Sequence, residues 1–522
     1  MPGNRLLADY LGGTLTPGEF FARDFRDDGA PGRRAEPAAL SAALVAFQQR
    51  LGADEAAVAN ARRLADPLTP VVTVGQQPGL LTGPLYTPYK ALTAISLARH
   101  IGTLRDRTAV PVFWAGCDDD DRGEVDHCGC WDQRGQMTMI HYPEEAGEPG
   151  QLAGSLPAGE YGGRVIAQLA PLLDGLPYAG DTLALLRGTL AESADLGEWF
   201  CRLLARLFGP LGMVVCDPRL PEMRRLGAEV LRRELAEPLH TTRLVNEGAE
   251  KLHAAGYAPA LTKPEETVNL FLADGLRRQR VSYRDGQFIA AGATHAREDL
   301  LAMLAADPGC LLPNAVLRPV VQEYLFGSAA FVAGPHELCY WAELLPVFRA
   351  LGVEMPPVVP RAGATLVSSG TASFLRNHRL DALSLLHDYD GVRLRLLAEA
   401  QPAAMQLMFT RAREQVDGLV AGMAEVLADY ESTLAGSALA TQQRMLNEVE
   451  RLERKALKAV ERRSTELTER LEASAHSLFP GRGLQERLLN IGSLLARFGQ
   501  GVPEQLLDLL DGQEGYHLVV EI

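Results

Sequence analysis

Two patterns of hydrophobic residues alternate along the first part of the chain. Short continuous apolar runs at Thr69–Gly75, Val110–Ala115 and Leu211–Asp217 predict buried strands. Leu85–His100 lies between the first two runs and has helical periodicity, which gives the strand, loop, helix and strand of a parallel βαβ unit. Pro37–Leu51 is also helix-like, with an apolar face. The pattern therefore predicts an α/β core built on a parallel sheet.

Two insertions are expected to interrupt this core. The first, 136–210, is mainly helical in pattern, and the second, around 265–295, predicts a hairpin with strands at Val268–Leu272, Arg280–Tyr283 and Phe288–Ala291. Residues 1–135 would then hold the N-terminal helices and the first half of the core. Residues 211–393 would hold the second half.

The pattern changes to a charged, heptad-like repeat from about Leu394. Apolar residues step by three and four in two runs, which are separated near Gly436. They are Val416, Leu419, Met423, Val426 and Tyr430 in the first run, and Met445, Val449, Leu452, Ala456, Leu467 and Leu471 in the second. These runs predict an antiparallel coiled-coil arm over 394–477, and 478–522 is expected to pack back on the core. A two-helix arm buries little surface of its own, so we expect a homodimer through it, the alternative being a solvated spacer.

Composition narrows the classes of function. The chain has 522 residues and a formal net charge of -15, which argues against nucleic-acid binding because that binding relies on basic surface. No apolar run approaches the roughly 20 residues that cross a bilayer, and Met1–Tyr10 lacks the regions of a signal peptide. The seven cysteines are scattered without the spacing of a disulfide framework. A cytoplasmic protein with reduced thiols and no membrane contact is expected.

The strand at 110–115 is followed directly by a cluster of acidic residues that begins with Asp118–Asp121 and is called the acidic knot below. Ligands of open α/β sheets bind outside the carboxyl ends of the strands, so this position favours chemistry. Adjacent carboxylates repel by about 3 kcal/mol at an effective dielectric near 20, and an enclosed cluster therefore needs a cation, donors or raised pKa values. The candidate catalytic residues are Asp118, Asp119, Asp121, Glu124 and His127. The alternative is a solvated acidic loop.

A glycine-rich loop, 75–84, joins the first strand to its helix. Backbone amides at a helix start attract anions, although the loop has neither the P-loop ending nor the dinucleotide spacing. Candidate nucleotide- or carboxylate-binding residues here are Gly75, Gln76, Gln77, Gly83, Tyr86 and Lys90. The alternative is that the glycines only form a tight turn.

A third group of candidates follows in the second half of the core. Asn314 and Arg318 pair an amide with a guanidinium at a helix start, which suits carboxylate or phosphate recognition. Further on, a Gly-Pro step opens a helix whose first turn carries His336 and Glu337. The candidate binding residues are Asn314, Arg318, Gly334, Glu337, Tyr340, Trp341 and Arg361. Alternatively, Glu337 only favours the helix N-terminus and the aromatic residues belong to the core.

Taken together, these blocks resemble the bacillithiol synthase family, the cysteine-adding enzymes of bacillithiol biosynthesis. The resemblance covers most of the chain and is carried by Gly75–Tyr86 with Lys90, Pro111–His127, Asn314 with Leu317–Pro319, Gly334–Trp341, Pro360–Arg361, and Leu484–Arg487 after Phe479–Pro480. The family pattern after the second strand is typically Glu-Asp-His-Asp, whereas this chain has four aspartates, with Asp120 at the histidine position. The resemblance implies a Rossmann-like core with connecting insertions and a coiled-coil dimerisation arm.

The reaction implied by the resemblance joins the carboxylate of L-cysteine to the amine of glucosaminyl-malate as an amide. A carboxylate is a poor acyl donor, so ATP activation as an acyl-adenylate is expected. The Gly75 loop and Lys90 would face phosphate, and Asp118, Asp119 or Asp121 would hold Mg²⁺. His127 or Glu124 would be the base, with Asp120 a substitute, and Arg318 or Arg361 would hold malate carboxylates. The acidic knot would alternatively bind the substrate ammonium groups.

Zinc is not expected as a cofactor. Cys117, His127, Cys128 and Cys130 include soft ligands, but they lack the paired spacing of a structural zinc site, and no metal-ligating residue is assigned. Two other functions remain open. One is a Mg-dependent nucleotide hydrolase or nucleotidyltransferase, and the other is a non-catalytic coiled-coil scaffold.

Overall fold

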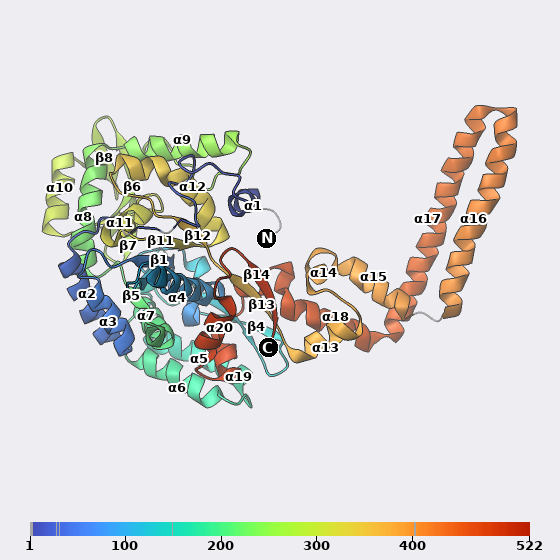
Figure 1. Cartoon of the computed structure of the whole chain (residues 1–522), viewed down its shortest axis with the longest axis horizontal. Coiled ribbons are helices and arrows are strands. Elements are labelled where there is room, and N and C mark those ends of the chain that lie inside the picture. The colour runs from blue at the N-terminus through green and yellow to red at the C-terminus, as the bar shows by residue number, and fades with distance from the viewer. Residues whose placement is uncertain (1–3, 28, 31, 149, 401–402) are drawn as a thin grey trace. The chain divides into compact units, whose positions relative to one another are not determined.

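The chain folds into two compact units. The computed structural model describes residues 4–27, 29–30, 32–148, 150–400 and 403–522 (Figure 1). The first unit comprises Met1–Thr365 with Glu486–Leu518, and the second comprises Leu366–Gln485 with Val519–Ile522.

A five-stranded parallel sheet forms the centre of the first unit. Its strand order is β12-β11-β1-β2-β5. The strands are β1 (Val71–Gln76), β2 (Val110–Ala115), β5 (Val214–Cys216), β11 (Ala330–Ala333) and β12 (Val358–Pro360). Every residue of β2 is buried because this strand lies between β1 and β5 and is covered by helices. The expected α/β core with a parallel sheet is confirmed.

Helices cover this sheet. Helix α4 (Tyr86–Leu104) packs against β1, β2 and β11, whereas α2 (Pro37–Leu51), α3 (Glu55–Arg63) and α7 (Leu196–Phe208) pack against β5. Other helices of the first unit are α1 (Arg5–Leu11), α8 (Pro221–Ala236), α9 (His240–Ala254), α10 (Arg297–Ala306), α11 (Leu317–Phe326) and α12 (Pro335–Ala350). The expected helices after Pro37 and Leu85 are both present.

The outer strand β5 is paired on its free side by a side chain. The Gln48 amide of α2 donates to the Val215 carbonyl at 2.7 Å and accepts from the Val215 N–H at 3.1 Å. Gln48 is fully buried. Its amide therefore replaces the neighbouring strand that β5 lacks.

The first insertion contains a hairpin and helices. Strands β3 (His127–Trp131) and β4 (Met137–His141) are antiparallel, and α5 (Gly159–Leu173) and α6 (Ala179–Ala191) follow. The buried thiols Cys128 and Cys130 belong to an apolar cluster with residues of these helices.

The second insertion is larger than the predicted hairpin. It forms an antiparallel sheet in the order β10-β6-β7-β8-β9. The strands are β6 (Thr267–Asp274), β7 (Arg277–Arg284), β8 (Gln287–Ala290), β9 (Ala293–His295) and β10 (Leu311–Pro313). The last part of the chain adds α19 (Ile491–Phe498), α20 (Val502–Leu510) and β14 (His517–Glu521), which pairs with β13 (Gly363–Val367).

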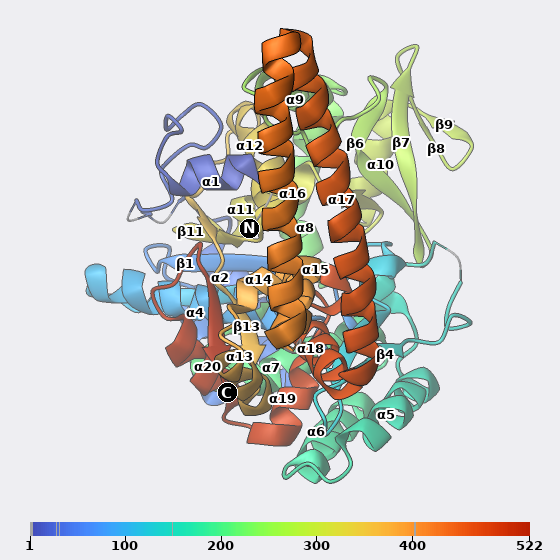
Figure 2. The same cartoon turned by 90° about the vertical axis from the view of Figure 1, so that its right-hand side faces the viewer.

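The second unit is helical. Helices α13 (Ser369–Asn377), α14 (Ala382–His387) and α15 (Tyr389–Glu399) share an apolar cluster with α18 (Thr465–Leu478). This cluster explains why the unit begins at Leu366, earlier than the arm expected from 394. Helices α16 (Ala403–Tyr430) and α17 (Ser432–Arg463) lie side by side (Figures 1 and 2).

The two long helices form an antiparallel pair. Arg413 contacts Glu453 at 2.6 Å, and Asp417 contacts Gln442 at 2.7 Å. As the residue number increases along α16, the number of the partner residue in α17 decreases, so the two helices run in opposite directions. The break between the helices lies at Glu431 and not at Gly436, which is inside α17. No helix in the described ranges is long and apolar enough to cross a membrane.

Candidate active site

A cavity of about 540 Å³ lies at the carboxyl ends of β1, β2 and β11 in the first unit. Strands β2 and β5 follow β1 on one side, and β11 and β12 lie on its other side. The strand order therefore changes direction between β1 and β11, which is where open α/β sheets bind their ligands.

The cavity brings together most of the residues that the sequence singled out. Those on its lining are Gly75, Gln76, Gln77, Tyr86, Lys90, Asp118, Asp119, Glu124, Asn314, Arg318, Gly334, His336, Glu337, Tyr340 and Arg361. Four other candidates, Gly83, Asp121, His127 and Trp341, are not part of the lining.

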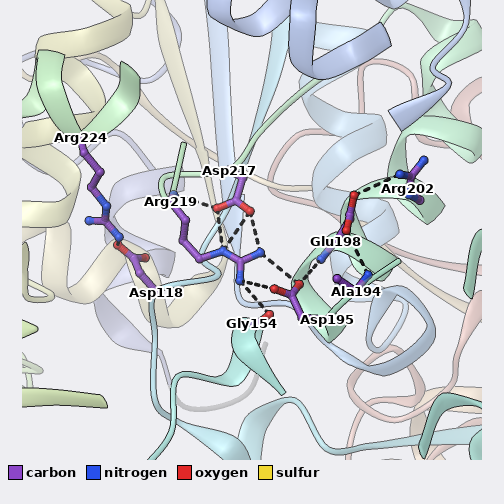
Figure 3. Close-up of polar contacts among 9 residues, drawn as sticks. All are labelled: Asp118, Gly154, Ala194, Asp195, Glu198, Arg202, Asp217, Arg219 and Arg224. Carbon is purple, nitrogen blue, oxygen red and sulfur yellow. Dashed lines mark hydrogen bonds and ion pairs between the residues drawn. The ribbon is translucent and has the colours of Figure 1, made fainter. Parts of the chain in front are cut away.

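Arginines neutralise the acidic knot. The buried Asp118 carboxylate lies 3.1 Å from an Arg224 nitrogen (Figure 3). The Arg278 Nη2 lies 2.6 Å from carboxylate oxygens of both Asp119 and Asp120, and the same side chain donates to the Asp118 carbonyl at 3.0 Å. Gln77 donates to the second oxygen of Asp119 at 3.2 Å.

These pairings do not fit the expected magnesium site. Magnesium needs carboxylate oxygens that are free to enter an octahedral shell. Both Asp119 oxygens accept hydrogen bonds, Asp118 is paired with Arg224, and Asp121 lies outside the cavity lining. Asp119 and Asp120 therefore act as partners of Arg278 from β7, and Asp118 acts as the partner of Arg224 from α8.

The two candidate bases are placed differently. Glu124 lies in a short 3₁₀ helix, Arg122–Glu124, and lines the cavity. His127 begins β3 one position after Asp126, whose carboxylate lies 3.0 Å from its Nδ1. The His127 ring stacks on His141 with centroids 6.1 Å apart. Pairing of β3 with β4 thus keeps His127 outside the cavity lining.

Lys90 lies at the centre of a buried polar network. Its ammonium donates to the Gly75 carbonyl at 2.9 Å and to the Gln76 amide oxygen at 2.7 Å, and it pairs with the Glu337 carboxylate. Burial lowers the pKa of the Lys90 ammonium, while Glu337 opposes this shift. Glu337 also accepts the Gly334 N–H at 2.7 Å, so it caps α12 as well as balancing Lys90.

The glycines of the loop are explained by its tight turn. A Cβ on Gly79 would lie 2.7 Å from the Gly83 Cα, and Gly83 has a φ of +77°. Leu81 and Thr82 also have positive φ values, 54° and 80°. The buried Asn490 side chain donates to the Leu81 carbonyl at 2.7 Å and to the Gly83 carbonyl at 2.8 Å, which holds this conformation. The polar contacts to the cavity come from Gln76 and Gln77 instead.

The third group of candidates, from the second half of the core, divides between the cavity and the core. Arg318 donates to the Tyr340 hydroxyl at 2.7 Å and to Gln322 at 3.4 Å. The Asn314 amide donates to Asn269 at 2.9 Å and accepts from the Val316 N–H at 2.9 Å. Trp341 is fully buried and stacks on Phe331 at 4.2 Å, as the core interpretation expects.

Arg361 is held by a fully buried partner from the last part of the chain. Its Nη2 lies 2.5 Å from the Glu486 Oε1 and its Nη1 lies 3.0 Å from the Glu486 Oε2. The guanidinium therefore borders the cavity with its charge already balanced by a two-point ion pair.

Sequence reasoning missed four cations on the lining. These are Lys263, Arg278, Arg280 and, as an individual site residue, Arg487. The predicted strand begins at Arg280, so the sequence pattern did not indicate that Arg278 lies two positions earlier on the same strand, β7, and faces the same way. Counting these, seven Lys and Arg side chains line the cavity against four Asp and Glu, although the whole chain is acidic.

A second polar cluster lies behind Asp118. Ligand atoms of Cys117, Cys201 and Asp217 lie within 4.8 Å of one another. Both oxygens of Asp217, however, accept hydrogen bonds from Arg219, which also contacts Asp195 (Figure 3). Burial raises the pKa of the Cys117 and Cys201 thiols, whereas a metal binds the thiolate. Arg219 therefore links the end of β5, through Asp217, to the start of α7, through Asp195.

Comparison with known proteins agrees with this architecture. The family model described as "Bacillithiol biosynthesis BshC, N-terminal Rossmann-like domain" matches residues 2–362, and that described as "C-terminal coiled-coil domain" matches residues 364–522. A protein of Geobacillus thermodenitrificans named "Putative cysteine ligase BshC" is 30% identical and covers 99% of this chain and 98% of its own.

Two further relatives carry the same name. The protein of Geobacillus kaustophilus is 29% identical over 99% of this chain and 97% of its own, and that of Solibacter usitatus is 30% identical over 88% and 86%. The chain therefore belongs to the BshC family of bacillithiol biosynthesis, with the family's Rossmann-like and coiled-coil domains in that order.

Proposed function

We propose that the chain is a ligase that forms an amide between the carboxylate of L-cysteine and the amine of glucosaminyl-malate. The cysteine ligase name of its full-length relatives supports the choice of reaction. The observation that carries the proposal is the cationic surplus of the cavity in an otherwise acidic chain, because nucleotide phosphates and malate carboxylates are anions.

ATP is proposed as the activating co-substrate. The cysteine carboxylate attacks the α-phosphorus of ATP, a C–O–P linkage forms, and pyrophosphate leaves. The amine nitrogen then attacks the acyl carbon, loses a proton, and expels AMP. The protein contributes orientation and countercharge in both steps. Since the aspartates are already paired with arginines, magnesium would enter with the phosphates of the nucleotide.

Glu124 is the proposed base for the attacking ammonium. Of the two bases first considered, it lines the cavity and His127 does not. It also interacts with Tyr86, and burial together with Glu124 raises the pKa of that phenol to about 12. A neutral Tyr86 hydroxyl is thus available to orient a substrate beside Glu124.

We also propose that two chains pair through α16 and α17. The apolar stripe of α16 does not pack inside the hairpin: Leu419, Met423 and Val426 are 54–59% exposed. They recur at spacings of four and three and so lie on one helix face. An exposed apolar stripe of this kind is typical of a protein-protein contact.

The test incubates the purified chain with magnesium and ATP, L-cysteine and glucosaminyl-malate, and detects the coupled thiol by mass spectrometry. We expect product only with all substrates present, together with AMP and pyrophosphate in equal amounts. Glu124→Gln is expected to lower the rate by about 10² or more with the fold unchanged. Pyrophosphate or phosphate release without cysteine would instead favour the nucleotide hydrolase or nucleotidyltransferase. No turnover with any substrate would favour the scaffold.

A further inference from the structure

Two cations of the cavity lining that lie on or next to the second insertion form no ion pair in the described residues. Within the part of the chain that the structure describes, the side chains of Lys263 and Arg280 form no ion pair and no hydrogen bond, although both line the cavity. By contrast, Lys90, Arg278 and Arg361 are each paired with a carboxylate. Lys263 and Arg280 therefore bring unpaired charge to the side of the cavity formed by the second insertion.

The register of the β6–β7 hairpin aims this charge at the cavity. Phe271 lies directly opposite Arg280 across the two strands, and Ala273 lies opposite Arg278. Side chains directly opposite each other, or two positions apart, share one face of a sheet. Phe271, Arg278 and Arg280 accordingly occupy the same face, and all three line the cavity.

Lys263 approaches the same point from the segment before β6. Burial and the nearby charge of Arg280 both lower the pKa of its ammonium. The nearest acid, Glu343, accepts the backbone N–H groups of Ala260 and Leu261. The effect of Arg280 on this pKa reflects repulsion between the two cations, which an anionic ligand bound by both would relieve.

The third unpaired cation belongs to a different neighbourhood. Tyr86, at the start of α4, interacts with the charged side chains of Arg487, Glu124 and Arg361. Neither Lys263 nor Arg280 takes part in that group. The cavity thus offers two separate cationic regions, one beside the loop that follows β1 and one on the second insertion.

We propose that Lys263 and Arg280 form a carboxylate-binding subsite that holds the malate carboxylates of the amine substrate. This assignment rests on the proposed function and replaces Arg318 and Arg361, whose charges or donors are already engaged by Tyr340 and Glu486. A dicarboxylate carries two anionic groups, and the flexible ammonium of Lys263 and the planar guanidinium of Arg280 line the same cavity and can each bind one of them.

The experiment measures binding without turnover. Isothermal titration of the full chain with L-malate, and separately with ATP, is compared for the natural chain, Lys263→Met, Arg280→Gln and Arg284→Gln. Arg284 is a matched control, because it lies on the same strand, pairs with Glu266 and is not part of the cavity lining. We expect malate affinity to fall about tenfold in the first two variants only, with ATP affinity changed less than about twofold.

Turnover gives an independent readout. The KM for glucosaminyl-malate is expected to rise about tenfold in both variants, while kcat and the KM values for ATP and cysteine stay unchanged. If the two variants lose ATP binding but retain malate binding, the pair is a phosphate site and the proposal is overturned. The proposal is also overturned if both variants bind malate as tightly as the control Arg284→Gln. If the natural chain binds malate through these residues but forms no coupled thiol, the subsite stands and the proposed reaction falls.

Discussion

Arg361 and Glu486 form a two-point ion pair across 125 positions of the chain, with nitrogen–oxygen distances of 2.5 and 3.0 Å. Glu486 is fully buried and Arg361 is 8% exposed. Replacing one partner leaves the other charge buried without compensation, which typically costs 3–5 kcal/mol. The pair therefore fixes the last part of the chain against the end of β12.

Glu486→Gln is expected to lower the free energy of unfolding by about 3 kcal/mol or more. Urea denaturation followed by circular dichroism measures this loss. The matched control is Glu521→Gln, since Glu521 pairs with Arg376 at 2.6 Å but both side chains are exposed, and a loss below about 1 kcal/mol is expected. Equal losses in both variants would show that burial of the first pair has no energetic consequence.

Acidification is expected to weaken the contact made by His517. Burial lowers the pKa of its imidazole below the usual 6.5, although Glu486 opposes the shift, and Thr365 lies 2.9 Å from its Nε2. As the pH falls through 6.5, the unfolded chain binds a proton that the folded chain does not, so stability is lost with a slope of at most about 1.4 kcal/mol per pH unit. Unfolding temperatures measured from about pH 5 to 8 check this, and His517→Gln should flatten the profile.

Removing Arg278 is expected to create a cation site that the natural chain lacks. Arg278→Gln leaves the carboxylates of Asp119 and Asp120 adjacent without their shared partner. Calorimetric titration with Mn²⁺ should then show binding in the variant and none in the natural chain. Arg277→Gln is the control, because Arg277 pairs with Glu148 and is not part of the cavity lining. Manganese binding of equal strength in all three proteins would contradict the neutralisation described above.

The loop after β1 is expected to open when Asn490 is shortened. Asn490→Ala removes the donors to the Leu81 and Gly83 carbonyls, each worth about 1–3 kcal/mol when a buried group is left unpaired. Amide hydrogen exchange in the segment 79–86 should accelerate at least tenfold, and exchange in α16 should not. The exposed Asn377, changed to Ala, serves as control. Unchanged exchange in the loop would show that its backbone conformation does not depend on this side chain.

Charges placed on the stripe of α16 are expected to separate the proposed dimer. Leu419→Glu with Met423→Glu should halve the mass measured by light scattering after gel filtration without lowering the unfolding temperature, because both residues are exposed in the single chain. Glu414→Gln on the same helix should leave the mass unchanged. If the natural chain elutes as a monomer, the proposed dimerisation through α16 and α17 is wrong.

Much of the architecture follows from local sequence pattern. The buried strands at β1, β2 and β5 are continuous apolar runs, and Lys90 lies on the helix between the first two. The pairing of Asp119 with Arg278 joins residues 159 positions apart, and no local pattern contains it. The heptad stripe of α16 also predicted a helix correctly, but periodicity alone does not say whether the facing helix belongs to the same chain.

Neighbouring residues can differ in role for simple geometric reasons. Tyr340 and Trp341 are consecutive in α12, where each step turns by about 100°, so one meets the cavity and the other the core. His127 follows the acidic knot closely in sequence, yet it already belongs to β3 and pairs with His141. The sequence located this region of the cavity, whereas the direction of each side chain depends on the strand pairing.

The amide of Gln48 has a consequence for how the protein behaves at high concentration. An unpaired outer strand offers its N–H and C=O groups to any extended peptide, which is a common route to aggregation. Because Gln48 occupies the groups of Val215, a foreign segment would first have to displace a buried glutamine from within its own molecule. One side chain thereby makes this border of the sheet a poor template for fibrous assembly.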